Sequence, residues 1–269
     1  MNPLTAGTSN AGSGIIQSLS SNQSSINDIQ TQLSTNKKIL DPAQQGVVTR
    51  LASQVTSYSA AHNNIAKAQN VLNVASTGLK SISTLLTQMQ DLANKANDAT
   101  MTTADAAKLN QTFLHLLAQV GSTATASKVD SVGLLHSGAT NLAIQTGLTS
   151  SDTTTITAVN ADTTTLGVSA LDISTSSGAA LAIAKLQTAL DTVSTSQSSV
   201  AADQMALQTV DEQDASISQN LQNTIDTIQK PDAAKLQMEL QNANNQQSMN
   251  YYLINQMNQE ASSVLTIFR

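Results

Sequence analysis

Apolar residues recur every seven positions along the first third of the chain. One row consists of Leu19, Ile26, Leu33 and Leu40, and a second consists of Leu51, Tyr58, Ile65, Leu72, Leu79 and Leu86. Small or apolar residues follow the second row at a spacing of three, which completes the a/d pattern of a coiled-coil seam. The pattern predicts long, narrow-faced helices between about residues 15 and 97.

The two rows are out of phase across the segment Asp41-Pro42-Ala43-Gln44-Gln45-Gly46. A proline cannot sit inside a helix without disrupting it, whereas it is favoured at the first helical position after an N-cap aspartate. We therefore expect one helix that ends near Lys38 and a second one over about residues 42–97. The glycines ahead of the first row, Gly12 and Gly14, predict a flexible tail there.

The middle of the chain, residues 98–177, has a different pattern. Residues 103–119 predict one more helix, with an apolar face formed by Leu109, Phe113, Leu116, Leu117 and Val120. Beyond it, Leu142 and Ile144 alternate with other residues, a turn follows over 147–152, and residues 153–159 are rich in β-branched side chains. These features predict a β-hairpin, although a solvated Thr-rich loop fits the same composition.

The last third returns to the heptad pattern. Its main row is Leu186, Val193, Val200, Leu207, Asp214, Leu221 and Ile228. Pro231 ends this helix, and a final helix is expected over 232–269. The apolar face of that helix holds Leu236, Leu240, Ala243, Tyr251, Ile254, Met257, Ala261, Leu265 and Phe268.

These elements predict a mainly α fold, with long antiparallel coiled-coil helices from both chain ends and a small β-hairpin in the middle. Four parts are expected: an N-terminal helix (1–41), a central rod whose first part holds a long helix, a second helix and the hairpin (42–177), the C-terminal long helix of that rod (178–230), and a C-terminal helix (231–269). The two end helices carry more apolar positions than one partner helix can cover. Other subunits are expected to bury the remainder.

Composition narrows the classes of function. The 12 Lys and Arg residues against 18 Asp and Glu residues give a net charge of −6, which disfavours nucleic-acid binding. Aromatic residues make up 2% of the chain and cysteine is absent, so stacking platforms, disulfides and thiolate sites are not expected. No apolar run of membrane-spanning length occurs, and the first residues do not resemble a cleavable secretory signal.

Candidate chemistry is sparse. His62, His115 and His136 have no ligand-type spacing, and Asp211, Glu212 and Asp214 are expected to form a solvated acidic patch more readily than a cation site. Asp214 also occupies a seam position, where a polar side chain can fix register at some cost in stability. We predict no enzyme, no cofactor and no metal.

Several segments, in order and at both ends, resemble bacterial flagellin. They are Ser9-Asn10-Ala11-Gly12, the stretch from Leu33 to Ile39, the helix from Ile65 to Ala96, Leu166-Gly167-Val168, and the closing Val264-Leu265-Thr266-Ile267-Phe268-Arg269. The resemblance covers nearly the whole chain. The hairpin leads almost directly into Leu166, which resembles a short, core-only member without outer inserted domains.

The resemblance implies a structural subunit that self-assembles into the bacterial flagellar filament for motility. The end helices would form the inner tube, with subunit-interface residues Leu19, Ile26, Leu33, Leu240, Tyr251, Ile254, Leu265 and Phe268. Flagellins leave the cell through the flagellar export channel, so the implied partners are the export apparatus, an export chaperone and hook-associated proteins. The implied location is the extracellular filament.

Departures from the family pattern leave a neighbouring family open, the hook–filament junction proteins. Gln90, Asp91 and Leu92 stand where flagellins often have Arg-Glu-Leu, a run that contributes to recognition by the innate-immune flagellin receptor. This departure leaves recognition by that receptor open. The ending Ile267-Phe268-Arg269 resembles flagellin more than the junction proteins.

Overall fold

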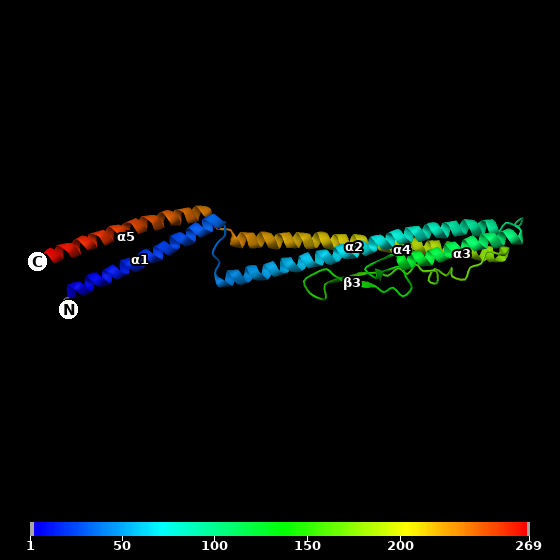
Figure 1. The fold of residues 1–269 in the computed structure, drawn as a ribbon, viewed down its shortest axis with the longest axis horizontal. Coiled ribbons are helices and arrows are strands. Elements are labelled where there is room, and N and C mark those ends of the chain that lie inside the picture. The colour runs from blue at the N-terminus through cyan, green and yellow to red at the C-terminus, as the bar shows by residue number, and fades with distance from the viewer. Residues whose placement is uncertain (1–2, 268–269) are drawn as a thin grey trace. The chain divides into compact units, whose positions relative to one another are not determined.

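The computed structural model describes residues 3–267, with side-chain exposure given for 12–263 (Figure 1). Its helices are α1 (Pro3–Thr35), α2 (Pro42–Ala96), α3 (Thr103–Ala126), α4 (Ser176–Gln229) and α5 (Ala233–Ile267). The mainly α class with long helices from both ends is confirmed. The chain divides into a terminal unit, made of residues up to 52 and from 221 onward, and a central unit of residues 53–220.

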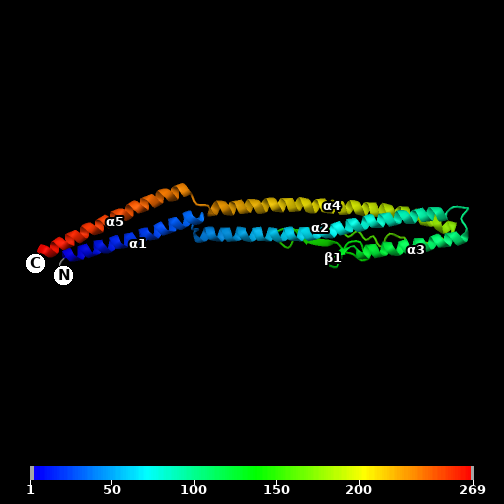
Figure 2. The same cartoon turned by 45° about the horizontal axis from the view of Figure 1, so that its top comes forward.

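Within the terminal unit, α1 and α5 lie antiparallel and side by side in both ribbon views (Figures 1 and 2). Residues spaced alternately by three and four form the facing seams, as in a coiled coil. On α1 these are Gly12, Ile15, Leu19, Asn22, Ile26, Ile29 and Leu33; on α5 they are Leu236, Leu240, Ala243, Gln247, Asn250, Ile254 and Met257.

The expected flexible tail at Gly12 and Gly14 is wrong, because α1 is helical from Pro3 onward. At Gly12 a Cβ atom would lie 3.3 Å from Cε of Met257 on α5. A glycine at this seam position therefore lets the two helices approach closely, and the packing outweighs the low helix propensity of glycine.

Both predicted helix breaks are present. The carboxylate of Asp41 accepts a hydrogen bond from the backbone N–H of Gln44 at 2.8 Å, and that of Asp232 accepts one from Lys235 at 3.1 Å. These are N-cap bonds for the first turns of α2 and α5. The helix α2 starts at Pro42, as predicted from the proline and its preceding aspartate.

In the central unit, α2 and α4 run antiparallel and are linked by polar pairs. The amide of Gln204 donates to Oδ1 of Asn73 at 2.9 Å, and that of Gln90 donates to Oε1 of Gln187 at 3.3 Å. From Ile65 onward on α2 and up to Leu207 on α4, the predicted heptad rows are buried in one continuous core that α3 completes. Its main contributors are Ile65, Leu72, Leu79 and Leu86 of α2, Phe113 and Val120 of α3, and Leu186, Val193, Val200 and Leu207 of α4.

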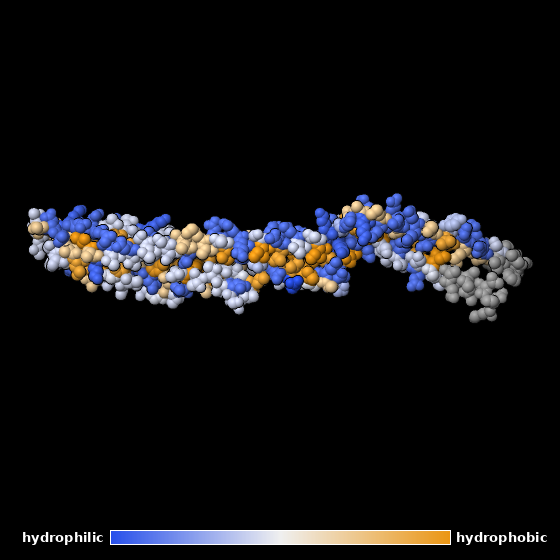
Figure 3. All heavy atoms as spheres, turned by 180° about the vertical axis from the view of Figure 1, so that it is seen from behind, coloured by the Kyte–Doolittle hydropathy of each residue, from blue (hydrophilic) through white to orange (hydrophobic). Residues whose placement is uncertain are grey.

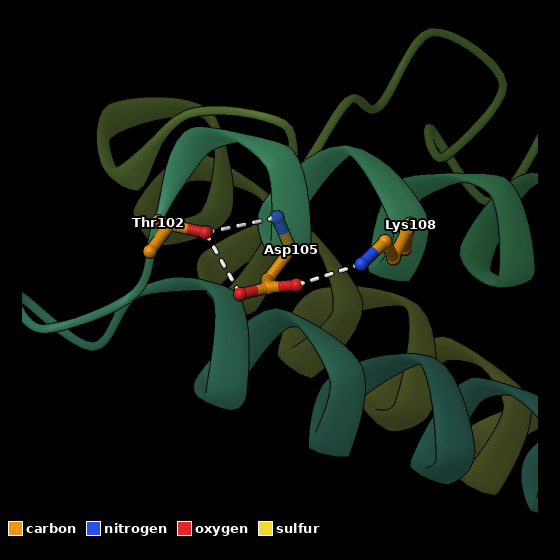
Figure 4. A network of polar contacts seen from close by, with 3 residues as sticks. All are labelled: Thr102, Asp105 and Lys108. Atoms are coloured by element: carbon orange, nitrogen blue, oxygen red, sulfur yellow. Dashed lines mark hydrogen bonds and ion pairs between the residues drawn. The ribbon is translucent and has the colours of Figure 1, made fainter.

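The third helix extends further than expected, to Ala126 instead of residue 119, because Val120 and Ala124 continue its buried face. Its first turn is held by a network of three side chains (Figure 4). The hydroxyl of Thr102 accepts from the N–H of Asp105 at 3.2 Å and donates to its carboxylate at 2.8 Å, and Lys108 lies 3.0 Å from the second carboxylate oxygen. The hydrogen bond from Thr102, followed by Lys108, lowers the pKa of Asp105.

The predicted hairpin is formed by β3 (Leu142–Gln145) and β4 (Thr153–Ile156), which pair antiparallel with Leu142 opposite Ile156. A second, smaller hairpin was not predicted. It joins β1 (Lys128–Val129) to β2 (Val132–Gly133) through Asp130 and Ser131, whose φ angles are 48° and 73°. Two positive φ values are typical of the type I′ turn, which normally carries Asn-Gly and is therefore hard to predict from Asp-Ser.

Candidate assembly interface

The seam between α1 and α5 contains polar side chains that bond across it. The amide of Asn22 is buried and donates to the backbone carbonyl of Ala243 at 2.7 Å. Near it, Gln247 donates to Oε1 of Gln23 at 2.6 Å. Because these bonds form only in one alignment of the two helices, they fix the register of the pair.

The apolar part of the seam is thin. In the described part of the terminal helices, its buried apolar side chains are Ile26, Ile29, Leu236 and Ala243. Ile26 is therefore covered within the chain itself, and the other interface candidates Leu19, Leu33, Leu240 and Ile254 are half-buried there. Two helices of 33 and 35 residues thus bury little apolar surface against one another.

A second apolar strip runs along the side of α5 that faces away from its seam. It consists of Met238, Met249 and Tyr252, which are 61%, 64% and 62% exposed. Met238 and Tyr252 each lie two residues from seam positions on either side, which places them on the opposite side of the helix. We call these three residues the outer strip of α5.

Two further exposed residues, Tyr251 and Leu253, flank the seam. Tyr251 was predicted as an interface residue, whereas Leu253 and the outer strip were missed. Met238 and Tyr252 stand opposite the seam, where a two-stranded coiled coil normally carries polar residues, but polar Asn245 lies between them, so heptad counting alone did not reveal the strip. The side chain of Leu265, in α5, and all of Phe268 lie outside the described residues.

Few charges accompany these apolar residues. Asp28 is the charged residue within the span of α1, and Lys235, Glu239 and Glu260 are those of α5. Lys235 and Glu239 form an exposed pair at 3.8 Å, which contributes little to stability. A further helix can therefore pack on α5 with little loss of charge hydration.

Apolar residues also reach the surface elsewhere. On the face drawn in Figure 3, orange apolar residues lie between blue polar ones. In the central unit the largest exposed examples include Met205 and Leu181, at 63% and 56%. These two lie on α4 and provide a comparison for the strip on α5.

The three residues of the altered receptor motif lie on α2. Gln90 is half-buried and bonds to Gln187 of α4, Asp91 is exposed, and Leu92 packs partly against the core. Part of this motif is therefore structural, because Leu92 contributes to the packing and Gln90 links two helices.

The described part of the chain also bears on sites of other kinds. No group of three or more His, Cys, Asp or Glu side chains there could hold a metal ion, and none of those helices is both long and apolar enough to cross a bilayer. His62 contacts Asp211, 149 residues away in sequence, which no local spacing could have indicated. The ring of His136 contacts the carbonyl of Ser137.

The known proteins that this chain resembles are flagellins. A family model described as "Bacterial flagellin N-terminal helical region" matches residues 8–140. The flagellin FljK of Caulobacter vibrioides is 28% identical over 99% of both chains, and a flagellin of Halalkalibacterium halodurans is 23% identical over 93% of both. The crystal structure of Bacillus cereus flagellin aligns with a TM-score of 0.46 at 24% identity, covering 60% of this chain and 88% of that one. The chain belongs to the bacterial flagellin family.

Proposed function

We propose that copies of this chain assemble into the bacterial flagellar filament by packing the outer strip of α5 against the terminal helices of neighbouring copies. The observation that carries this proposal is the position of the strip. Met238, Met249 and Tyr252 are exposed opposite a seam that α1 already occupies, so the helix pair leaves them free for a neighbouring molecule to cover. The filament subunit is a structural protein, and we infer no catalytic role for it.

The contact would join two different surfaces, the outer strip of one copy and another face of the next. In such a head-to-tail contact, each copy keeps one of the two surfaces free for the next copy. When the rotation between successive copies does not close into a ring, the result is an open helical polymer. Fully burying a large apolar side chain contributes about 1.5–3 kcal/mol. The three strip residues therefore supply several kcal/mol per subunit as an upper estimate.

The four parts expected from the sequence acquire roles in this proposal. Residues 1–41 and 231–269 would build the inner tube, and residues 42–177 and 178–230 would form the rod around it. The predicted interface residues Leu19, Leu33, Leu240, Tyr251, Ile254, Leu265 and Phe268 would contribute to the tube, with Ile26 stabilising the helix pair itself. The short stretch between α3 and α4 supports a core-only subunit.

The same exposed surface supports a proposal about the partners that the subunit meets before it assembles and at the ends of the filament. A helix with an uncovered apolar strip aggregates unless it is protected, which supports the proposal of an export chaperone that binds the terminal helices. We further propose passage through the flagellar export apparatus and contact with hook-associated proteins at the filament ends. The final location would be the extracellular filament.

Recognition by the innate-immune flagellin receptor is proposed to be weakened. Where relatives of the family often carry an Arg-Glu-Leu run, this chain presents Gln90, Asp91 and Leu92. The loss of the positive charge at Gln90 removes a potential ion pair, and that side chain is already engaged by Gln187.

The test is seeded polymerisation of the full chain, followed by electron microscopy. Purified protein is added to short fragments of filaments made from the same chain. Elongation into long, regular filaments is expected. Seeds that become capped without elongating would contradict the proposal and identify the chain as a hook–filament junction protein, which adds only a short zone.

A further inference from the structure

A carboxylate is buried in the seam between α2 and α4. Asp214 is 6% exposed and continues the row of Val193, Val200 and Leu207. Its Oδ2 atom has no hydrogen-bond partner among the described residues. A charged carboxylate with a buried, unpartnered oxygen destabilises the packed state, whereas its protonated form carries less of that penalty.

Asp214 lies where the core of the central unit ends. The continuous apolar core stops at Ile65 on α2 and at Leu207 on α4. In the remaining parts of this unit, residues 53–64 and 208–220, the buried side chains are Ala61 and Asp214. The helix pair is therefore thin here, and a local opening of this segment exposes little apolar surface.

Other titratable groups surround this position. On α4, Asp211 lies one turn before Asp214, and Glu212 is exposed. On α2, the Nδ1 atom of the exposed His62 lies 2.5 Å from the carboxylate of Asp211, Tyr58 is half-buried, and Lys67 is exposed.

The hairpin β3–β4 packs on α2 at the same level, because Asn64 donates to the carbonyl of Gln145 at 3.3 Å. Its titratable group is Asp152, whose carboxylate accepts a hydrogen bond from the N–H of Thr149 within its own turn. Asp152 is thus engaged locally. The imidazole of His62 contacts Asp211, one of the carboxylates on this part of α4.

We propose that Asp214, together with the Asp211–His62 pair, forms a proton-sensitive latch that closes the α2–α4 seam in acid and loosens it as the pH rises. Protonation of Asp214 removes the buried charge. The contact with His62 holds the Asp211 carboxylate one turn before Asp214, where its charge repels that of an ionised Asp214.

The direction of the effect follows from linkage. Burial, followed by the nearby charge of Asp211, raises the pKa of Asp214 above its ordinary value of 3.8. When a carboxyl group has a higher pKa in the folded state than in the unfolded state, the folded state loses stability as the pH rises. The loss begins at the pKa of the unfolded state and is complete above the pKa of the folded state. Relative to acid, the equilibrium constant for opening of this segment at pH 7.5 is therefore larger by about tenfold for each pH unit by which folding raises the pKa of Asp214.

The test is amide hydrogen exchange of residues 207–217 in the full chain between pH 4.5 and 8, corrected for intrinsic exchange rates. In the unmodified protein, protection is expected to fall as the pH rises. In Asp214→Asn, which has the same shape without the charge, protection at pH 8 is expected to be higher and the slope flatter. Glu212→Gln, an exposed neighbour, should follow the unmodified protein.

Two further variants keep the test decisive if the asparagine disturbs the packing. Asp214→Leu continues the apolar row and should also remove the pH slope. Asp211→Asn removes the repulsion and should move the transition to lower pH without abolishing it. A pH-independent unmodified protein, or parallel profiles for it and both Asp214 variants, would overturn the proposal.

Discussion

The side-chain amide of Asn22 donates a buried hydrogen bond to the backbone carbonyl of Ala243, 221 residues later in the chain. This bond crosses the seam between α1 and α5 at a position where an apolar residue would pack more favourably. A single polar residue in such a seam selects one register at some cost in stability. Asn22 therefore aligns the two ends of the chain.

We predict that Asn22→Leu stabilises the helix pair by about 1 kcal/mol but broadens its register. The chain has no cysteine of its own, so spin labels can be placed through Gln30→Cys and Gln237→Cys on exposed positions of the two helices. Electron–electron distance measurements should give one narrow distribution with Asn22 and a wider one with leucine. Equal widths would show that Asn22 does not set the register.

The caps at the helix breaks predict local losses of stability. Asp41→Ala and Asp232→Ala each remove the bond to the N–H of Gln44 or Lys235 and should cost about 1 kcal/mol, measured by urea unfolding. Asp28→Ala is the control, because Asp28 is exposed in the interior of α1. A loss as large in the control would mean that the charge matters and the capping does not.

Gly78 is predicted to tolerate no side chain. A Cβ atom there would lie 2.2 Å from Oγ of Ser127 and 2.7 Å from Cδ1 of Leu135, where the chain leaving α3 crosses α2. Gly78→Ala should therefore destabilise the protein by about 1–3 kcal/mol. At Gly46 of the same helix nothing lies within 4 Å of that position, so Gly46→Ala should stabilise it by about 0.5–1 kcal/mol. Changes of the same sign in both variants would contradict this account.

Acid is predicted to weaken the loop before α4 through Asp162. Burial raises the pKa of the Asp162 carboxyl, but hydrogen bonds from Thr165 and from the N–H of Thr164 outweigh it and hold the pKa below 3.8. Because the pKa of Asp162 is lower in the folded state, the ionised carboxylate stabilises the fold at pH values above its pKa in the unfolded chain. This stabilisation is lost as the pH falls through its pKa in the folded state. The melting temperature should drop between about pH 4 and 2, and less steeply in Asp162→Asn. Identical acid slopes would exclude this role.

The sequence predicted those parts of the fold that depend on local rules. Pro42 and Pro231 mark both helix breaks, and the heptad rows through Leu72 and Val193 mark the buried seam. The hairpin of Asp130 and Ser131 and the helical course through Gly12 could not be predicted in this way. They depend on tertiary contacts that override the local preferences of aspartate, serine and glycine.

The candidate site was predicted less completely for a related reason. Heptad counting finds residues such as Ile26 that face a partner within the chain, and it does not distinguish them from residues that face another subunit. The outward residues Met238 and Tyr252 fall between the heptad positions and become informative only once α1 is placed on the other side of α5. Likewise, the contact between His62 and Asp211 depends on the register of two helices that are far apart in sequence.

The most direct test of the assembly account is the elongation rate of seeded filaments by the double variant Met238→Gln/Tyr252→Gln. Met205→Gln is the control, because Met205 is equally exposed but lies on α4. Two buried apolar contacts are worth enough to slow elongation by on the order of tenfold or more, with an unchanged circular dichroism spectrum. Elongation by the double variant at the rate of the control would contradict the claim that the outer strip of α5 joins neighbouring subunits.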